Sequence, residues 1–122
     1  MSYQQSPSHT PGSRLRQLLA NGEVLVCPGV YDGLSTRMAI EAGFQCLYMT
    51  GAGVSMSRIG MADLGLATQT EMVDTAGMIA NIDPKIPLIA DAEYVPDVLD
   101  VASLFVLEGS FAIIANASLM LI

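Results

Sequence analysis

The segment that most constrains the fold is residues 87–93, PLIADAE, an apolar run that begins at a proline and ends on two carboxylates. A continuous apolar run bounded in this way is typical of a buried strand in a parallel sheet. The acids, Asp91 and Glu93, then emerge at the C-terminal edge of the sheet, where α/β proteins place their chemistry. This run therefore predicts both an α/β architecture and the position of a site.

The two acids favour a hard metal ion such as Mg²⁺, which binds through one or two carboxylates together with waters and substrate oxygens. Asp91 and Glu93 are two residues apart, so their side chains lie on the same side of an extended chain. On this run alone, a solvated loop start remains the alternative interpretation.

Composition restricts the class of protein. A chain of 122 residues with 52% hydrophobic content is a single globular unit or a piece of one. A net charge of −7 with five basic residues argues against nucleic acid as a partner. The apolar C-terminal segment is too short to span a bilayer, so no membrane association is expected. Cys27 and Cys46 lie in apolar runs, which favours buried reduced thiols and a cytoplasmic setting.

The order of elements is that of repeated βα units. Strands are predicted at residues 23–28 and 44–50 and from residue 87, with a glycine-bearing loop over residues 51–67. Right-handed crossovers then bring the strand ends at Pro28, Thr50 and Asp91 to one face. Three helices are predicted from their end signals. The first covers residues 14–20, between a Ser13 cap and Gly22, and the second runs from the Asp32 cap to about residue 42, before Gly43. The third covers residues 71–81 and is preceded by a Thr68/Glu71 capping box.

Two further groups point to the same face. In Thr50-Gly51-Ala52-Gly53 the small residues leave backbone N–H groups open to an anion, although a merely flexible loop is the alternative. Met56 stands where a dinucleotide-binding fingerprint needs glycine, which disfavours a Rossmann site. Asp63 lies between glycines in the long connection, as in a mobile loop over a ligand, or else is a surface turn acid. His9, the one histidine, falls in a polar leader without a positioned partner.

Several short blocks follow one another in order along the chain: CPGVYDGLS (27–35), AGF (42–44), LYMTGAG (47–53), ADLGL (62–66), TEM (70–72) and PLIADA (87–92). Together they resemble the isocitrate lyase/phosphoenolpyruvate mutase superfamily, in particular 2-methylisocitrate lyases, oxaloacetate hydrolases and carboxyvinyl-carboxyphosphonate phosphorylmutase-like proteins. The resemblance implies a (β/α)₈ barrel that binds Mg²⁺ and a small oxo- or hydroxy-carboxylate. It places Thr50, Gly51 and Ala52 on the substrate carboxylate, Asp91 on the metal, and Asp63 near the substrate.

The resemblance ends close to the acid pair. The family pattern Asp-Ala-Asp-Thr-Gly-Tyr-Gly is replaced by DAEYVP (91–96), so Glu93 is one methylene longer than the family's aspartate. No family block is identified from Val95 onward, where a helix over residues 97–108 and a strand over 111–114 are expected. The family's lysine- and cysteine-bearing catalytic loop has no counterpart.

The predicted fold class is therefore α/β, a partial (β/α)₈ TIM barrel of the first three βα units plus a divergent apolar tail. Three regions are expected: a disordered leader (1–12), the N-terminal part of a lyase domain (13–94) and the tail (95–122). The expected function is Mg²⁺-dependent cleavage of a C–C or P–C bond in a carboxylate such as oxaloacetate or methylisocitrate. The expected assembly is a homo-oligomer if the barrel is complete. The alternative is an inactive truncated fragment that at most associates with full-length relatives.

Overall fold

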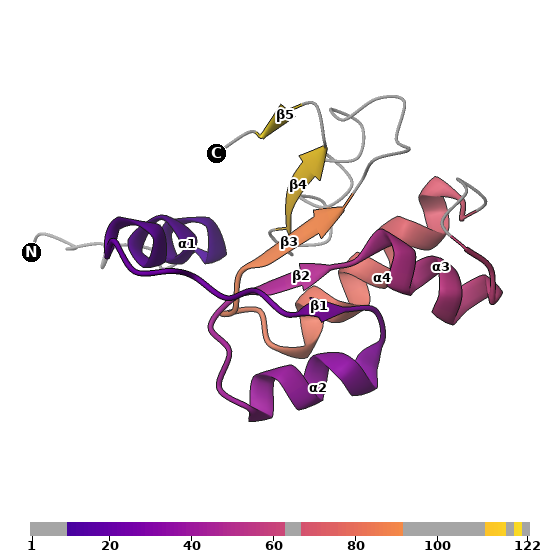
Figure 1. Cartoon of the computed structure of the whole chain (residues 1–122), viewed down its shortest axis with the longest axis horizontal. Coiled ribbons are helices and arrows are strands. Elements are labelled where there is room, and N and C mark those ends of the chain that lie inside the picture. The colour runs from indigo at the N-terminus through magenta and orange to yellow at the C-terminus, as the bar shows by residue number, and fades with distance from the viewer. Residues whose placement is uncertain (1–9, 63–66, 92–111, 117–118, 121–122) are drawn as a thin grey trace, which may run out of the picture.

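Helices and strands alternate along the chain in a computed structural model that describes residues 10–62, 67–91, 112–116 and 119–120. The elements are α1 (Pro11–Ala20), β1 (Gly29–Val30), α2 (Gly33–Glu41), β2 (Leu47–Met49), α3 (Gly51–Ile59), α4 (Gln69–Ile82), β3 (Leu88–Asp91), β4 (Ala112–Asn116) and β5 (Leu119–Met120). The strands form one sheet in the order β1-β2-β3-β4-β5 (Figure 1). Strands β1 to β4 are parallel, and β5 is antiparallel to β4. The predicted α/β fold with a parallel sheet is confirmed.

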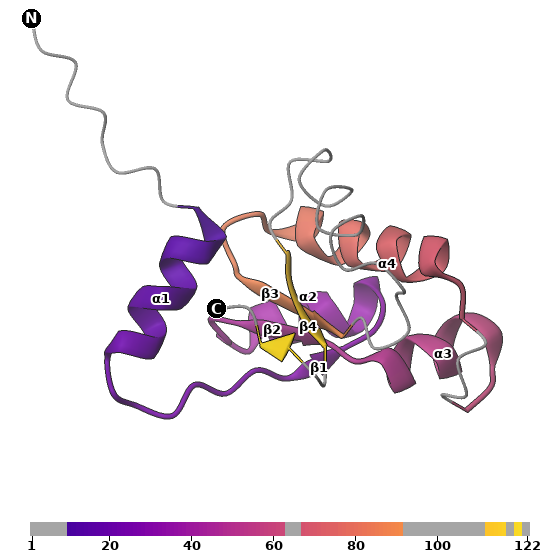
Figure 2. The same cartoon turned by 90° about the horizontal axis from the view of Figure 1, so that it is seen from above.

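Helices α2 and α4 cover one face of the sheet. Helix α2 packs against β1 and α4, and α4 packs against β3. Burial alternates along β2 and β3, so every second side chain enters this layer. Helix α1 lies beyond the N-terminal ends of the strands and α3 beyond their C-terminal ends (Figures 1 and 2). The core between sheet and helices consists of Val30, Ala39, Leu47, Met49, Val54, Ala76, Ile79, Ala80, Leu88 and Ala90.

Local hydrogen bonds begin the two core helices where the sequence predicts them. At α2, the Ser35 N–H donates to Asp32 Oδ1 at 2.7 Å, and this bond holds the pKa of Asp32 below its usual value. At α4, the Thr68 N–H donates to Glu71 Oε2 at 2.7 Å, which lowers the pKa of the Glu71 carboxyl. Each helix therefore starts with a capping box. The sequence predicted the box at α4, whereas at α2 it predicted only the Asp32 cap.

Glycines in the left-handed region follow the first two helices, also as predicted. Gly22 has φ +72° after α1, and Gly43 has φ +91° after α2. Helix α1 nevertheless starts earlier than expected, because Thr10 rather than Ser13 is its cap: the Ser13 N–H donates to Thr10 Oγ1 at 3.2 Å. A proline at the first helical position supports this earlier start.

The strand predicted over residues 23–28 is wrong. That segment is not a strand, and Val24 and Val26 are 92% and 59% exposed. Pairing starts only where the Tyr48 N–H donates to the Pro28 carbonyl at 3.0 Å, and β1 itself is Gly29–Val30. Pro28 has no N–H to add to a ladder. An apolar sequence does not make a strand unless a neighbouring strand supplies the hydrogen bonds.

The loop predicted over residues 51–67 is also wrong in its first half, which forms α3. Helix α3 begins at the Thr50 cap and ends at Gly60, with φ +66°. Two tertiary contacts compensate for its glycines: Val54 is fully buried, and Arg58 Nη1 donates to Thr75 Oγ1 of α4 at 2.9 Å. The helix predicted over 97–108 lies outside the described residues, whereas β4 overlaps the strand predicted at 111–114.

Candidate functional site

The C-terminal ends of β1, β2 and β3 lie side by side. Val30 pairs with Met49, and Met49 pairs with Ala90. The residues that follow, Tyr31, Thr50 and Asp91, therefore lie at one level along the sheet edge. The predicted convergence of strand ends at Thr50 and Asp91 is confirmed, while the first strand ends after Val30 rather than at Pro28.

The predicted anion-binding segment is a helix N-terminus rather than a loop. Thr50 Oγ1 accepts a hydrogen bond from the Gly53 N–H at 3.3 Å, so Thr50 is the cap of α3. The N–H groups of Gly51 and Ala52, in the first turn, have no acceptor within the helix. No acidic residue occupies that turn. Unpaired N–H groups and the positive end of the helix dipole favour an anion such as a carboxylate at this point.

Close packing fixes the direction in which α3 leaves the sheet. A Cβ on Gly53 would lie 2.5 Å from Thr50 Cγ2 and 3.1 Å from Tyr31 Cβ. Only glycine allows this helix turn to approach Tyr31 and Thr50 so closely. Tyr31, the residue after β1, thus shapes the site, a role that sequence patterns did not indicate. The register of β1 against β2 is the signal that reveals it.

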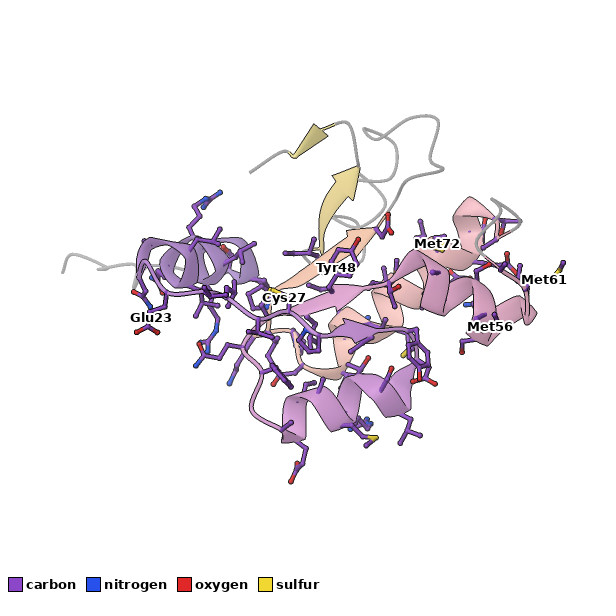
Figure 3. The ribbon with its side chains drawn as sticks, viewed as in Figure 1. Glu23, Cys27, Tyr48, Met56, Met61 and Met72 are labelled. Carbon is purple, nitrogen blue, oxygen red and sulfur yellow. The ribbon has the colours of Figure 1, made fainter. Side chains whose placement is uncertain are left out.

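Asp91 lies on the face of the sheet opposite α2 and α4. On β3 the buried residues Leu88 and Ala90 alternate with the half-buried Ile89 and Asp91. Ile89 pairs with Tyr48, and Figure 3 shows the Tyr48 side chain on the side of the sheet away from α2. Tyr48 is therefore a second residue near the site that the sequence analysis missed. Its position two residues before Thr50 is the signal that could have identified it.

The fit to Mg²⁺ depends on Asp91 within the described part of the chain. No group of three or more His, Cys, Asp or Glu that could hold a metal occurs among the described residues. Asp91 offers a hard oxygen donor at the sheet edge, on the side away from the core. One carboxylate with waters and substrate oxygens satisfies the coordination that Mg²⁺ prefers, so the residue fits this ion. The other predicted site acids, Asp63 and Glu93, lie outside the described residues.

Within the described ranges, no helix is both long enough and apolar enough to cross a membrane.

Comparison with known proteins identifies relatives along most of the chain. The phosphoenolpyruvate phosphomutase family model matches residues 15–117. This match continues past residue 94, although sequence patterns showed no family block there. The 2,3-dimethylmalate lyase of Eubacterium barkeri is 40% identical over 81 residues, which are 66% of this chain and 28% of that enzyme. The 2-methylisocitrate lyase of Aeropyrum pernix is 36% identical over 87 residues, 71% of this chain and 28% of that enzyme.

Solved structures give the same result. The crystal structure of oxaloacetate acetylhydrolase matches with a TM-score of 0.73 and 46% sequence identity, covering 84% of this chain and 38% of that one. The matched part of the chain spans 28% of the length of each of the two lyases, from Eubacterium barkeri and Aeropyrum pernix. The extent of the family match, together with the parallel α/β sheet, decides the assignment. The chain belongs to the phosphoenolpyruvate phosphomutase family, in the PEP mutase/isocitrate lyase superfamily.

Proposed function

We propose that this chain forms the first part of the active site of a Mg²⁺-dependent lyase or hydrolase. The reaction is cleavage of a C–C bond, or a P–C bond, in a small oxo- or hydroxy-carboxylate such as oxaloacetate or methylisocitrate. The observation that carries this proposal is the placement of the α3 N-terminus beside Asp91 at adjacent strand ends. An anion site and a hard oxygen donor at the C-terminal ends of neighbouring strands suit a carboxylate substrate bound with a divalent cation.

The substrate carboxylate is bound by Thr50, Gly51 and Ala52. Backbone N–H groups at a helix N-terminus hold an anion without a basic side chain, which suits a chain with five Lys and Arg in total. Gly53 keeps this turn against Tyr31, so the N–H groups are fixed in direction before substrate binds. Such preorganisation places the charge-stabilising groups without reorganisation during the reaction. Asp63 is assigned to the substrate from the connection that follows α3.

Asp91 and Glu93 are the residues that would hold Mg²⁺. When bound, the ion would polarise a substrate oxygen and stabilise the negative charge left as the bond breaks. Asp91 contributes a carboxylate at the C-terminal end of β3, where it pairs with Ala115 of β4. We place this activity in the cytoplasm, because Cys27 and Cys46 are both free thiols.

A second candidate function is association with full-length relatives by a chain that is itself inactive. Among the described strands, β1 pairs only with β2, so its other edge carries backbone groups without a strand partner. Val24 and Val26, in the segment that leads into β1, are exposed. An edge strand with exposed apolar neighbours favours pairing with another chain, including a copy of the same chain.

Calorimetric titration tests the first function. The chain is titrated with Mg²⁺ in the presence and absence of oxaloacetate, and the same titration is run on Asp91→Asn and on the matched variant Asp74→Asn. Asp74 is an exposed acid on α4, away from the strand ends. Binding in the wild type and in Asp74→Asn, with loss in Asp91→Asn, supports the metal site. No heat in the wild type, or equal heat in both variants, contradicts it.

An activity assay and a co-purification separate the two functions. Turnover of oxaloacetate or methylisocitrate by the chain alone supports the lyase or hydrolase. Lack of turnover together with stable co-purification with a full-length homologue supports the association. Substituting Val24 and Val26 with Ser should weaken that association, because these are exposed apolar side chains in the segment that leads into β1.

A further inference from the structure

The two cysteines of the chain lie next to each other at the N-terminal side of β1 and β2. Gly29 pairs with Tyr48, and the Tyr48 N–H donates to the Pro28 carbonyl at 3.0 Å. Two residues further back along both parallel segments are Cys27 and Cys46. Adjacent strands are about 5 Å apart, and disulfides join Cα atoms about 4.4 to 6.8 Å apart. Cys27 lies just before the ladder, yet its side chain forms a hydrogen bond with the Cys46 side chain, so the two thiols are neighbours in the fold.

The thiols differ in accessibility. Cys46 is fully buried, whereas Cys27 is half-buried and Figure 3 shows it on the segment that leads into β1. Burial, together with the smaller effects of the hydrogen bond and charge of the neighbouring Cys27 side chain, raises the pKa of Cys46 to about 12. Cys46 is thus unreactive toward solutes by itself, and an oxidant reaches the pair through Cys27.

We propose that Cys27 and Cys46 are an oxidisable pair, which a small disulfide such as glutathione disulfide converts to an intramolecular cystine. The Cys27 thiolate attacks one sulfur of glutathione disulfide, forms a mixed disulfide and releases one glutathione. Cys46 then attacks the Cys27 sulfur and displaces the second glutathione, and the Cys46 proton passes to the departing glutathione thiolate. Two protein thiols are oxidised and one glutathione disulfide is reduced to two glutathione molecules. This modification is independent of the proposed carboxylate site at the other end of the strands.

The crosslink joins the segment before β1 to the start of β2. It closes a loop that contains α2, because α2 is the helix between the two cysteines in the chain. The crosslink thereby attaches the C-terminal end of the exposed segment that contains Val24 and Val26 to the residue before β2. A loop closure of this kind restricts the unfolded chain, so the oxidised form should melt at a higher temperature than the reduced form.

Peptide mapping tests the pair directly. Arg37 is the trypsin site that separates the two cysteines, and Arg16 and Arg58 bound the two peptides. The folded chain is equilibrated with a series of glutathione disulfide to glutathione ratios, blocked with an alkylating reagent and digested without reduction. We expect peptides 17–37 and 38–58 to appear joined, with a loss of two hydrogens from the intact mass. The midpoint ratio should be at least about tenfold lower for the folded chain than for the chain in concentrated urea, because folding raises the effective concentration of one thiol at the other.

The single variants complete the test. Cys46→Ser should accumulate one glutathione on Cys27 and no crosslink, whereas Cys27→Ser should leave Cys46 unmodified in the folded chain, since Cys46 is buried. A wild-type chain that carries glutathione on Cys27 without forming the linked peptides would overturn the proposal. The same conclusion would follow from equal midpoints in buffer and in urea, a comparison that does not depend on the folding of any variant.

Discussion

Replacing Gly53 with alanine tests whether close packing fixes the N-terminus of α3. The added Cβ would lie 2.5 Å from Thr50 Cγ2 and 3.1 Å from Tyr31 Cβ and Cδ1. Rotating Thr50 would relieve the first contact, but this rotation moves the Oγ1 that accepts the Gly53 N–H at 3.3 Å. Because this rotation leaves the Tyr31 contacts in place, the variant should both lose the helix cap and crowd Tyr31.

The expected net cost follows from three contributions. Loss of a threonine cap costs about 1 kcal/mol, and overpacking costs about 1 to 3 kcal/mol. The higher helix propensity of alanine offsets about 0.5 to 1 kcal/mol. We therefore expect Gly53→Ala to lower the free energy of unfolding by about 1 to 3.5 kcal/mol.

Urea unfolding followed by circular dichroism measures this effect, with Gly12→Ala as the matched control. Gly12 also lies in the first turn of a helix, but a Cβ there would meet nothing within 4 Å, so its substitution should cause no loss of stability. Thr50→Ser removes the Cγ2 methyl and keeps the capping hydroxyl, so this background should recover part of the loss. Close packing at Gly53 is refuted if Gly53→Ala loses no more stability than Gly12→Ala, or if Gly53→Ala loses as much stability in the Thr50→Ser background as in the wild type.

Two further predictions concern the core and the cap of α2. Leu88→Ala should cost about 2 to 5 kcal/mol by chemical denaturation, because Leu88 is 1% exposed. Leu34→Ala is the control, because Leu34 on α2 is 69% exposed, and it should change the free energy of unfolding by less than about 0.5 kcal/mol. Equal losses of stability in the two variants would contradict the assigned core. Asp32→Ala should cost about 1 kcal/mol at neutral pH. The folded-state pKa of Asp32 lies below its ordinary value, so its stabilisation is present above that ordinary value and is lost as the pH falls through the folded pKa. The difference between wild type and variant should therefore shrink in acid, and a pH-independent difference would contradict the cap.

Local signals in the sequence accounted for most of the helices. Asp32 and Ser35, and Thr68 and Glu71, are three residues apart, so the hydrogen bonds that start α2 and α4 depend on neighbours in the chain. The strand that precedes Asp91 could be predicted because its apolar run has clear limits. The identity of the sheet edge then followed from the connection rule for parallel strands.

The candidate site was predictable only in part. Thr50 and Asp91 were expected at one edge, and the register of β1, β2 and β3 places them there. Tyr31 and Tyr48 lie within the blocks at 27–35 and 47–53, but their contributions were missed because neither side chain indicates a role in the site by itself. Their proximity to the site results from register and strand alternation, which are known only when the strands are paired.

By itself, the sequence determined the helix starts at Asp32 and Thr68, the parallel α/β architecture and the end of β3 at Asp91, because these depend on short-range bonds and on unbroken apolar runs. Tertiary structure alone decided two other features. Residues 23–28 are apolar but form no strand without a partner for their backbone groups, and α3 forms despite its glycines because Val54 is buried and Arg58 bonds to Thr75. In both cases, contacts between distant segments outweigh the local preference of the chain.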